Sequence, residues 1–552
     1  MAKGISAFRL ITIFCVVIPL MRVRSVPAQS NPSLQITNTN GSATISWPAQ
    51  SGLSFFLQST TNLLWSNSWV DSTVPTTVVG DRTMANLSMT NAQQFFRLKL
   101  PLFSFGLGVP VFQSAIFYNL DLEISPDQPM TINGKVFCNG NIWASPDATL
   151  TFQTYVDCTK LFQRTRNPND PLPPGGGPVV FGVLGSPFMN VAPSLGMLGY
   201  FPAVNGAILT INDRYGISQT IIAGEILDPP PPGEDPNTFG DMRYYNFADL
   251  IVSNSSTGVL TTFFQDTNNV ARLTPIPYDK TTVSTQTMVH GSITNYIYTT
   301  NYSYSFVTNT TFYDYREAKT VRAVQMDVGN LVAWITNNAT NGGSSYYFKN
   351  LSDKGHGIDT VYVYSGVPLT STQLPAVRLV NGQQLQPFGL TIATPIPLYV
   401  LGNYNVQTPG GSSLGANNTA YTYPAAFIAD AVTILSSNWS DSYNGNTNLV
   451  HRPAFDATVN AAILQGIVPS ATVGGVKHYS GGAENFFRLL EDWSSNTLTY
   501  NGSMVAMFNC RYATNYWQSP GNYFNEPAWQ WSFDMNFLTT NKLPPGTPNV
   551  SP

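Results

Sequence analysis

Short apolar segments, interrupted every few residues by glycine, asparagine, aspartate or proline, dominate this sequence. In residues 130–143, for example, the pairs Asn133-Gly134 and Asn139-Gly140 separate apolar runs of only a few residues. Runs this short predict brief β-strands joined by tight turns. Two arrangements fit them: hairpins with a turn at each Asn-Gly pair, or very short strands that bend at each pair and stack as a β-solenoid.

We favour the solenoid because similar segments recur far downstream. Each is a short apolar run that meets a turn, at residues 397–406, 426–435 and 461–468. No fixed repeat period is visible. The prediction for residues 101–552 is therefore a mainly β domain, folded as an irregular, β-helix-like solenoid.

Loops and short helices are expected to interrupt this domain. Proline fixes φ and removes a backbone donor, so the proline-rich runs near 171–178 and 228–236 predict loops. Apolar residues at helical spacing predict two helical inserts, one near 327–337 behind a candidate cap at Asp327, and one near 482–494.

Residues 29–100 predict a separate small domain of alternating strands. Ile45 and Trp47 fall on one face of a strand, and several strands at short spacing indicate a fibronectin-like β-sandwich. The segment resembles an accessory module of many exported bacterial proteins. The resemblance implies no catalytic residue, and it rests on Trp47-Pro48, residues 57–63, Trp69 and residues 95–98.

The first 28 residues have the pattern of a secretory signal peptide. Two basic residues precede an apolar run at residues 10–21, and Val26-Pro27-Ala28 is a small-residue cleavage site. An uncleaved anchor is the alternative, which Pro19 and the short run disfavour. We expect cleavage after Ala28, no transmembrane segment in the mature chain, and a secreted, periplasmic or cell-surface location.

Charge is scarce in this chain and mainly negative. The formal net charge is −4, and removal of the four basic residues of the signal peptide makes it −8. Nucleic acid is therefore not an expected partner. Charged residues make up 10% of the chain, against roughly 25% in an ordinary soluble domain, so amides, hydroxyls and tyrosines must solvate its surface.

The cysteines allow two states. Cys138 and Cys158 could form a disulfide that leaves Cys510 free, or all three could be buried free thiols. Neither state is favoured. The C-x-x-C spacing of zinc sites is absent, and we expect no metal and no cofactor.

Two short motifs resemble catalytic sites. The Gly-His-Gly triplet around His356 resembles one motif of the polygalacturonases, which are β-helix enzymes, but the sequence lacks the adjacent Asp-Asp pair of that family. Residues 411–415 match the Gly-x-Ser-x-Gly pattern of a nucleophile elbow, but their flanking residues indicate a polar loop. We interpret both as turns and loops, and we expect no catalytic residue.

Two groups of charged residues suggest other roles. Asp121 and Glu123 alternate on one strand face, where they could bind calcium, although a solvated face is the favoured interpretation. Asp314 and Glu317 flank Arg316 and predict a local ion pair.

A cluster of aromatic residues near the C-terminus is the candidate ligand-binding site. Flat rings beside amides can stack on sugars, although a cap over the open end of the solenoid is the favoured interpretation. The candidate residues are Tyr512, Tyr516, Trp517, Tyr523, Trp529 and Trp531.

Four stretches of the C-terminal two-thirds resemble a large group of uncharacterised exported bacterial proteins, which are distantly similar to accessory proteins of type IV pilus assembly. They are residues 133–142, residues 313–317 with 327–328, residues 397–403, and residues 423–439. Where a pilus protein has a membrane helix, this chain has an export signal and a sandwich. The resemblance adds pilus-associated assembly to the expected roles.

Together these observations predict an exported, non-enzymatic cell-surface or envelope protein that acts in adhesion, assembly or glycan contact. Its expected partners are surface glycans or other envelope proteins. The alternative is a β-helix polysaccharide lyase or glycoside hydrolase.

Overall fold

A computed structural model describes most of the chain. The described residues are 35–39, 42–48, 56–60, 70–71, 74, 76–79, 82–88, 95–99, 109–154, 156–158, 160–181, 189–191, 210–211, 223–234, 243–265, 273–290, 293–340, 357–407 and 418–551. The predicted signal peptide, residues 1–28, lies outside them. The chain divides into two compact units, one made mainly of Met1–Gly108 and the other of Val109–Asp213 and Ser218–Val550.

The first unit contains two antiparallel sheets that share one core. Ile45 and Trp47, which alternate to the same face of their strand, pack there with Leu57, Ala85 and Phe96. The strand order is β1-β2-β6-β5 in one sheet and β4-β3-β7 in the other. The strands are β1 (Gln35–Thr39), β2 (Ser42–Pro48), β3 (Phe56–Thr60), β4 (Val70–Asp71), β5 (Thr76–Val79), β6 (Arg82–Ser88) and β7 (Phe95–Lys99).

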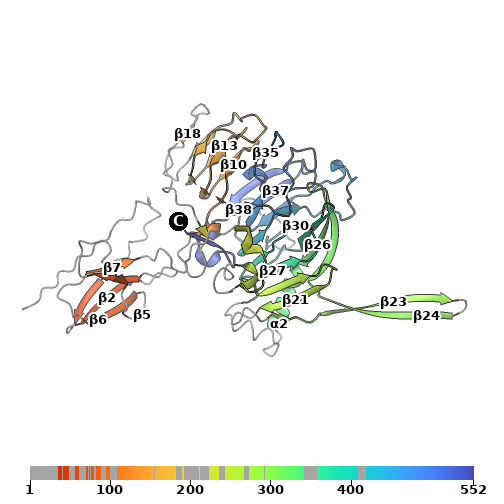
Figure 1. Cartoon of the computed structure of the whole chain (residues 1–552), viewed down its shortest axis with the longest axis horizontal. Coiled ribbons are helices and arrows are strands. Elements are labelled where there is room, and N and C mark those ends of the chain that lie inside the picture. The colour runs from red at the N-terminus through yellow and green to blue at the C-terminus, as the bar shows by residue number, and fades with distance from the viewer. Residues whose placement is uncertain are drawn as a thin grey trace, which may run out of the picture. The chain divides into compact units, whose positions relative to one another are not determined.

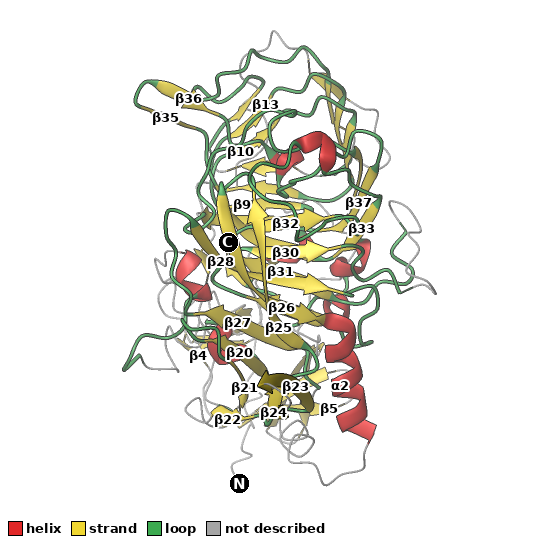
Figure 2. Cartoon of the chain, turned by 90° about the vertical axis from the view of Figure 1, so that its right-hand side faces the viewer, coloured by secondary structure: helices red, strands yellow, loops and turns green. Residues whose placement is uncertain are grey.

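The second unit is organised around one sheet of 11 strands, which lie one beside the next in Figures 1 and 2. Every neighbouring pair from β15 to β20 is parallel, and β21 and β22 extend the β20 end with antiparallel pairing. In sheet order the strands are β15 (Val156–Cys158), β12 (Val136–Cys138), β9 (Ile116–Tyr118), β38 (Met504–Asn509), β34 (Ala462–Ile467), β31 (Ala425–Ala429), β29 (Leu390–Ala393), β27 (Thr360–Ser365), β20 (Leu250–Asn254), β21 (Leu260–Gln265) and β22 (Leu273–Pro275).

Four smaller sheets accompany this one in the second unit. The largest has the order β25-β26-β28-β30-β32 and is parallel from β26 onward. Its strands are β25 (Val307–Asp314), β26 (Lys319–Asp327), β28 (Gln373–Val380), β30 (Leu398–Leu401) and β32 (Val432–Leu435). The other three contain β33 (Ala457–Asn460), β37 (Thr497–Gly502) and β39 (Ala528–Phe533); β10 (Leu122–Ile124), β13 (Ile142–Ala144) and β16 (Phe162–Gln163); and β11 (Met130–Ile132), β14 (Leu150–Phe152), β17 (Val179–Phe181) and β18 (Met189–Val191).

Strand partners near the start of the second unit are separated by a constant 20 residues. Ile116 pairs with Val136, and Val136 pairs with Val156. The same interval relates β10 to β13 and β11 to β14. Equivalent side chains therefore stack: the Asn139 amide donates to the Asn119 side chain, 20 residues away, at 2.7 Å.

This register corrects two interpretations of the sequence. Hairpins at the Asn-Gly pairs are wrong, because β11 and β12, which flank Asn133-Gly134, each pair in parallel with a strand 20 residues away. A fixed interval does exist, although the analysis of the sequence found none. It is short-lived, because a long insert separates β16 from β17.

The first strand set continues the sheet that the last strands build. β9 pairs in parallel with β38, with Ile116 opposite Met504. The Met504 amide donates to the Ala115 carbonyl at 2.9 Å, and the Ser503 hydroxyl donates to the Ser114 carbonyl at 2.5 Å. Segments from both ends of this unit consequently share one hydrophobic core.

Only one of the two expected helical inserts is a helix. The first is α2 (Val328–Thr340), where the Asp327 carboxylate caps the helix by accepting from the Asn330 amide at 2.9 Å. The other helical segments are α1 (Tyr244–Phe247) and the 3-10 turns η2 (Val111–Gln113), η3 (Ala223–Leu227), η6 (Leu449–His451), η7 (Ala483–Asn485), η8 (Met535–Leu538) and η9 (Thr540–Lys542). Within the described part of the chain, no helix is long and apolar enough to span a bilayer.

The prediction of a helix near 482–494 is wrong. After η7 the backbone is extended, and isolated parallel bridges join Arg488 to Thr433 and Asp492 to Pro453. The Arg488 amide donates to the Val432 carbonyl at 2.9 Å, a bond that a helix would have kept within the segment. The apolar spacing misled because residues on both faces of this segment are buried, not only one stripe.

Both proline-rich runs are irregular where they are described. Residues 171–178 and 228–234 contain no strand. The remaining strands are β8 (Val109–Pro110), β19 (Thr210–Ile211), β40 (Asn549–Ser551), β23 (Lys280–His290), β24 (Ile293–Ser303), β35 (Ala471–Val473) and β36 (Val476–His478).

The three cysteines of the second unit are free thiols. Cys138 and Cys158 are register partners on adjacent strands, but they form no disulfide. The Cys138 thiol instead donates to the Leu120 carbonyl at 3.1 Å and accepts from the Gly140 amide at 3.2 Å. Burial raises the pKa of Cys138 to about 12, so this sulfur is held as an unreactive thiol.

Asn119 provides a test of the junction between β9 and β38. Its amide donates to the Met507 carbonyl at 3.1 Å and accepts from Asn139. Because Asn119→Ala leaves these groups unpaired, it should lower the free energy of unfolding in urea by about 1–3 kcal/mol. Asn522→Ala, in an exposed loop, is the control and should change it little. Equal stabilities of the two variants would contradict the junction.

Candidate functional site

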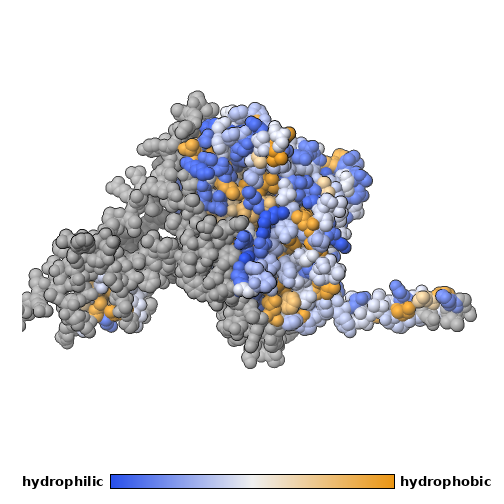
Figure 3. Space-filling model, viewed as in Figure 1, coloured by the Kyte–Doolittle hydropathy of each residue, from blue (hydrophilic) through white to orange (hydrophobic). Residues whose placement is uncertain are grey.

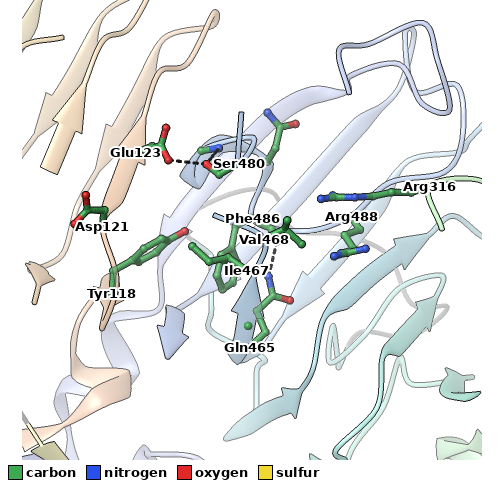
Figure 4. Close-up of a pocket in the computed structure, with 13 residues that line it drawn as sticks. Tyr118, Asp121, Glu123, Arg316, Gln465, Ile467, Val468, Ser480, Phe486 and Arg488 are labelled. Atoms are coloured by element: carbon green, nitrogen blue, oxygen red, sulfur yellow. Dashed lines mark hydrogen bonds between the residues drawn. The ribbon is translucent and has the colours of Figure 1, made fainter. Parts of the chain in front are cut away.

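A cleft forms where the first strand set meets the last ones (Figure 4). It encloses about 410 Å³, including space open to solvent. One wall is the segment from Tyr118 to Glu123, and the opposite wall carries Arg316 and Arg488. Phe486 and residues 465–468 line the space between them. We call this space the cleft.

The acidic wall of the cleft is held by protein donors. Asp121 accepts from the Asn141 amide at 2.9 Å and from the Trp143 indole at 3.1 Å. Glu123 is 5% exposed and accepts hydrogen bonds from the hydroxyls of Ser470 (2.9 Å) and Ser480 (3.1 Å). The solvated face that the sequence favoured for these two carboxylates is therefore wrong for Glu123.

A second buried carboxyl lies next to this wall. Glu484 accepts from the Tyr479 hydroxyl at 2.6 Å and from the Ser125 amide at 3.0 Å. Burial raises the pKa of Glu123 and of Glu484 to about 7, against the lowering effect of their hydrogen bonds. The two carboxyls attach the β10 strand to the segment that follows β36.

The basic wall differs from the local ion pair that the sequence predicted. Glu317 pairs with Arg488 at 2.6 Å, not with its neighbour Arg316. Asp314 accepts from the Tyr399 hydroxyl at 2.6 Å and from the Glu317 amide at 2.7 Å. The prediction failed because Arg488, 171 residues away in sequence, reaches the carboxylate first.

The six aromatic candidates do not form one surface. Trp529 and Trp531 on β39 lie together, with ring centroids 5.5 Å apart. Tyr516 stacks on His478 at 4.0 Å, and the Trp517 ring lies edge-on to Tyr479. The remaining two are placed separately, Tyr512 beside Asp430 and a buried Tyr523 against Phe524.

The catalytic motifs considered from the sequence lie outside the described residues. This holds for His356 and for residues 411–415. Of the other histidines, His290 ends the exposed strand β23 and His451 is exposed in η6. Across the described ranges, no group of three or more histidine, cysteine, aspartate or glutamate side chains could hold a metal ion.

A second candidate site is a hairpin formed by β23 and β24, which we call the arm. It extends away from the rest of its unit in Figure 1. Lys280 to His290 pair antiparallel with Ser303 to Ile293, and every residue of β23 is exposed. Neither strand pairs with any other described strand.

The base of the arm is firmly anchored. The Asp279 carboxylate accepts from the amide (2.8 Å) and the hydroxyl (2.6 Å) of Ser305, which joins the two ends of the hairpin. The rings of Tyr278 and Tyr304 lie 4.7 Å apart, and the Tyr304 hydroxyl donates to the Ile276 carbonyl at 2.9 Å. The arm therefore leaves the unit from an ordered base.

The two faces of the arm differ in character. Strand alternation places Val283, Val289, Tyr296, Tyr298 and Tyr302 on one face, with threonines between them and no charged residue. These five side chains are 59–67% exposed. Lys280, Gln286 and His290 lie on the other face. Figure 3 shows apolar residues exposed along the arm.

The signals for these sites were only partly visible in the sequence. The analysis of the sequence singled out Asp121, Glu123 and Arg316, but for other roles. Tyr118, Arg488 and the serines that bind Glu123 carry no local pattern, because the fold gathers them from segments hundreds of residues apart. The arm was missed although its strands alternate, because no hydrophobic core requires them.

The buried carboxyls of the cleft predict an unusual dependence of stability on pH. The pKa of Glu123 and Glu484 is about 7 in the folded chain and 4.5 as the ordinary value, so between these pH values the folded chain holds protons that the unfolded chain has released. The free energy of unfolding should therefore fall as pH rises from about 4.5 to about 7, by on the order of 1–3 kcal/mol for each carboxyl, and then level off.

Denaturant titrations at several pH values would measure this slope. Glu123→Gln removes one titrating group and should make the slope shallower than in the wild type. Asp147→Asn, at a side chain that is 58% exposed, is the control and should keep the wild-type slope. An identical slope in Glu123→Gln and the wild type would contradict the assignment.

No family model, no curated protein and no solved structure matches this chain. The function proposed below therefore depends on the geometry and chemistry of its own residues.

Proposed function

We propose that this chain is an exported, non-enzymatic component of a bacterial cell surface or envelope, and that it assembles through its arm. The observation that carries the proposal is an exposed, uncharged ribbon of tyrosine, valine and threonine on an ordered base. Two strands alone are marginally stable in water, so a third strand or a packed face is needed to hold them. An anchored ribbon of this kind is suited to contact with a partner.

The proposed scaffold is a fibronectin-like sandwich followed by an irregular β-solenoid. The two antiparallel sheets with one core support the sandwich. The parallel registers at an interval of 20 residues, and the continuation of β9 by β38, support the solenoid. Such a stack is a rigid mount for a projecting arm.

The buried acids of this scaffold support a structural role for its charged groups. Asp430 accepts from the backbone amides of Arg511 (2.6 Å), Tyr512 (3.1 Å) and Ala513 (2.9 Å). Glu491 accepts from the amide and the hydroxyl of Ser436 at 2.6 and 2.7 Å. Each of these carboxyls joins segments that are distant in sequence, as Glu123 and Glu484 do.

The partner that best fits the arm is a second copy of the same chain. A two-fold axis places the same face of two arms against each other, and this requires a face that is complementary to itself. The Tyr296 and Tyr298 face meets this condition because it has no charge to repel its copy. The mature chain carries a formal charge of −8, whereas the arm contains no aspartate or glutamate, so two copies can approach there without repulsion.

The size of the face sets the expected strength of association. An 11-residue ribbon of two strands is roughly 37 Å long and roughly 10 Å wide, so two packed faces bury on the order of 700 Å². This lies below the 1,200–2,000 Å² typical of stable complexes, roughly speaking, so association through arms alone should be weak and concentration-dependent.

Sedimentation velocity over a range of concentrations tests this proposal. The wild type should shift from monomer to dimer or larger species as concentration rises. Tyr298→Glu places a charge on the uncharged face and should keep the chain monomeric, with an unchanged melting temperature because the arm lies outside the core.

Thr299→Glu adds the same charge to the opposite face and is the matched control, which should associate as the wild type does. A wild type that stays monomeric throughout would contradict assembly through the arm. Turnover of plant, algal or bacterial polysaccharides by the purified chain would contradict the non-enzymatic part of the proposal.

A further inference from the structure

Arg316 is a buried guanidinium without a counter-ion of its own. It is 7% exposed, and the one hydrogen bond of its side chain within the described residues runs from Nε to the Asn515 carbonyl at 3.1 Å. Glu317, the nearest carboxylate in sequence, is taken by Arg488 at 2.6 Å and by the Asn515 amide at 3.2 Å. Two guanidinium groups thus share one carboxylate.

The unused donors of Arg316 face the cleft. Figure 4 shows its side chain extending from the strand toward Phe486 and Val468, with Arg488 beside it. Burial, and next the positive charge of Arg488, lower the pKa of Arg316. An unpaired buried charge is costly, and an anion that enters the cleft would relieve this cost.

The cleft contains a second polar group without a partner. The Tyr118 hydroxyl is buried and makes no hydrogen bond within the described part of the chain. Figure 4 shows the Tyr118 ring on the wall opposite Arg316, below Glu123. Since buried polar groups in folded proteins are almost always hydrogen-bonded, two such groups in one cleft indicate that a ligand completes it.

We propose that the cleft binds a small carboxylate-bearing ligand through Arg316. A planar guanidinium with two free terminal nitrogens matches a carboxylate, which it can bind with two parallel hydrogen bonds. The site is distinct from the arm and does not depend on assembly.

The opposite wall defines the rest of the ligand. Asp121 and Glu123 offer acceptor oxygens there and disfavour a second negative charge. The body of the ligand is therefore uncharged and rich in hydroxyl donors. A sugar acid of the hexuronate class has this chemistry, either free or at the end of an acidic polysaccharide.

Calorimetric titration with glucuronate tests the proposal, with acetate, glucose and a glucuronate polymer as further probes. The wild type should bind glucuronate more tightly than acetate, because acetate has only the carboxylate, and should not bind glucose. Tighter binding of the polymer would indicate a chain end as the natural source of the carboxylate, and equal binding per end would indicate the free sugar acid.

Arg316→Gln should weaken glucuronate binding by about 10-fold or more, because it removes a charge-assisted pair. Arg322→Gln is the matched control, since this arginine is exposed on the adjacent strand β26, and it should bind as the wild type does. Tyr118→Phe should weaken glucuronate binding while acetate binding stays unchanged.

Arg316→Lys keeps the charge but not the two-fold hydrogen bonding, and it serves if the glutamine variant does not fold. Intermediate affinity in this variant would support the proposal. Equal binding of glucuronate by the wild type and by either folded Arg316 variant would overturn it, as would a wild type that binds neither glucuronate nor acetate.

Discussion

The parallel pairing of β9 with β38 is the contact on which the second unit depends. Strands of three residues have too few hydrogen bonds and too little apolar surface to persist alone. β9, β12 and β15 persist because β38 offers β9 a complete strand edge, and β9 in turn serves β12. The hydroxyl of Ser503 and the amide of Met504 fix the register at this edge. The cleft with Glu123 and Arg316 exists only because this pairing brings the two strand sets together.

Charged side chains are few in this protein, and several of them act as cross-links in its interior. A buried carboxylate is costly unless donors surround it, so each one restricts which segments can lie next to it. Asp430 selects the segment after β38, and Glu491 selects the turn after β32. Glu317 selects Arg488 and so leaves Arg316 to the cleft. The one uncompensated charge described here is thus a consequence of how the neighbouring pair forms.

The sequence predicted those features that are encoded within a few residues. Brief strands, the core of Ile45 and Trp47, and the helix behind Asp327 depend on local alternation, turn residues and a cap, and all three were expected. The 20-residue interval is also local, since Ser-Pro-Asp recurs at residues 125–127 and 145–147. It escaped notice because the insert after Phe162 ends the pattern before a third copy.

The features that were missed depend on residues far apart in the chain. The segment at 482–494 has helical spacing, yet lateral hydrogen bonds to Val432 and Arg452 hold it extended. Arg316 has two acidic neighbours in sequence, yet neither of them pairs with its guanidinium. The cleft could not be assembled from the sequence because no pattern relates Tyr118 to Arg316 or Glu123 to the serines that bind it.

The arrangement of β9 against β38 also bears on how the chain acquires its fold. Ser114 and Ser503 are separated by 389 positions in sequence, so the first strands to emerge during synthesis or export find their edge only when nearly the whole chain is present. Closing a loop of this length is slow, and until it closes β9 presents an open strand edge that other chains can join. Completion of folding is therefore coupled to completion of translocation.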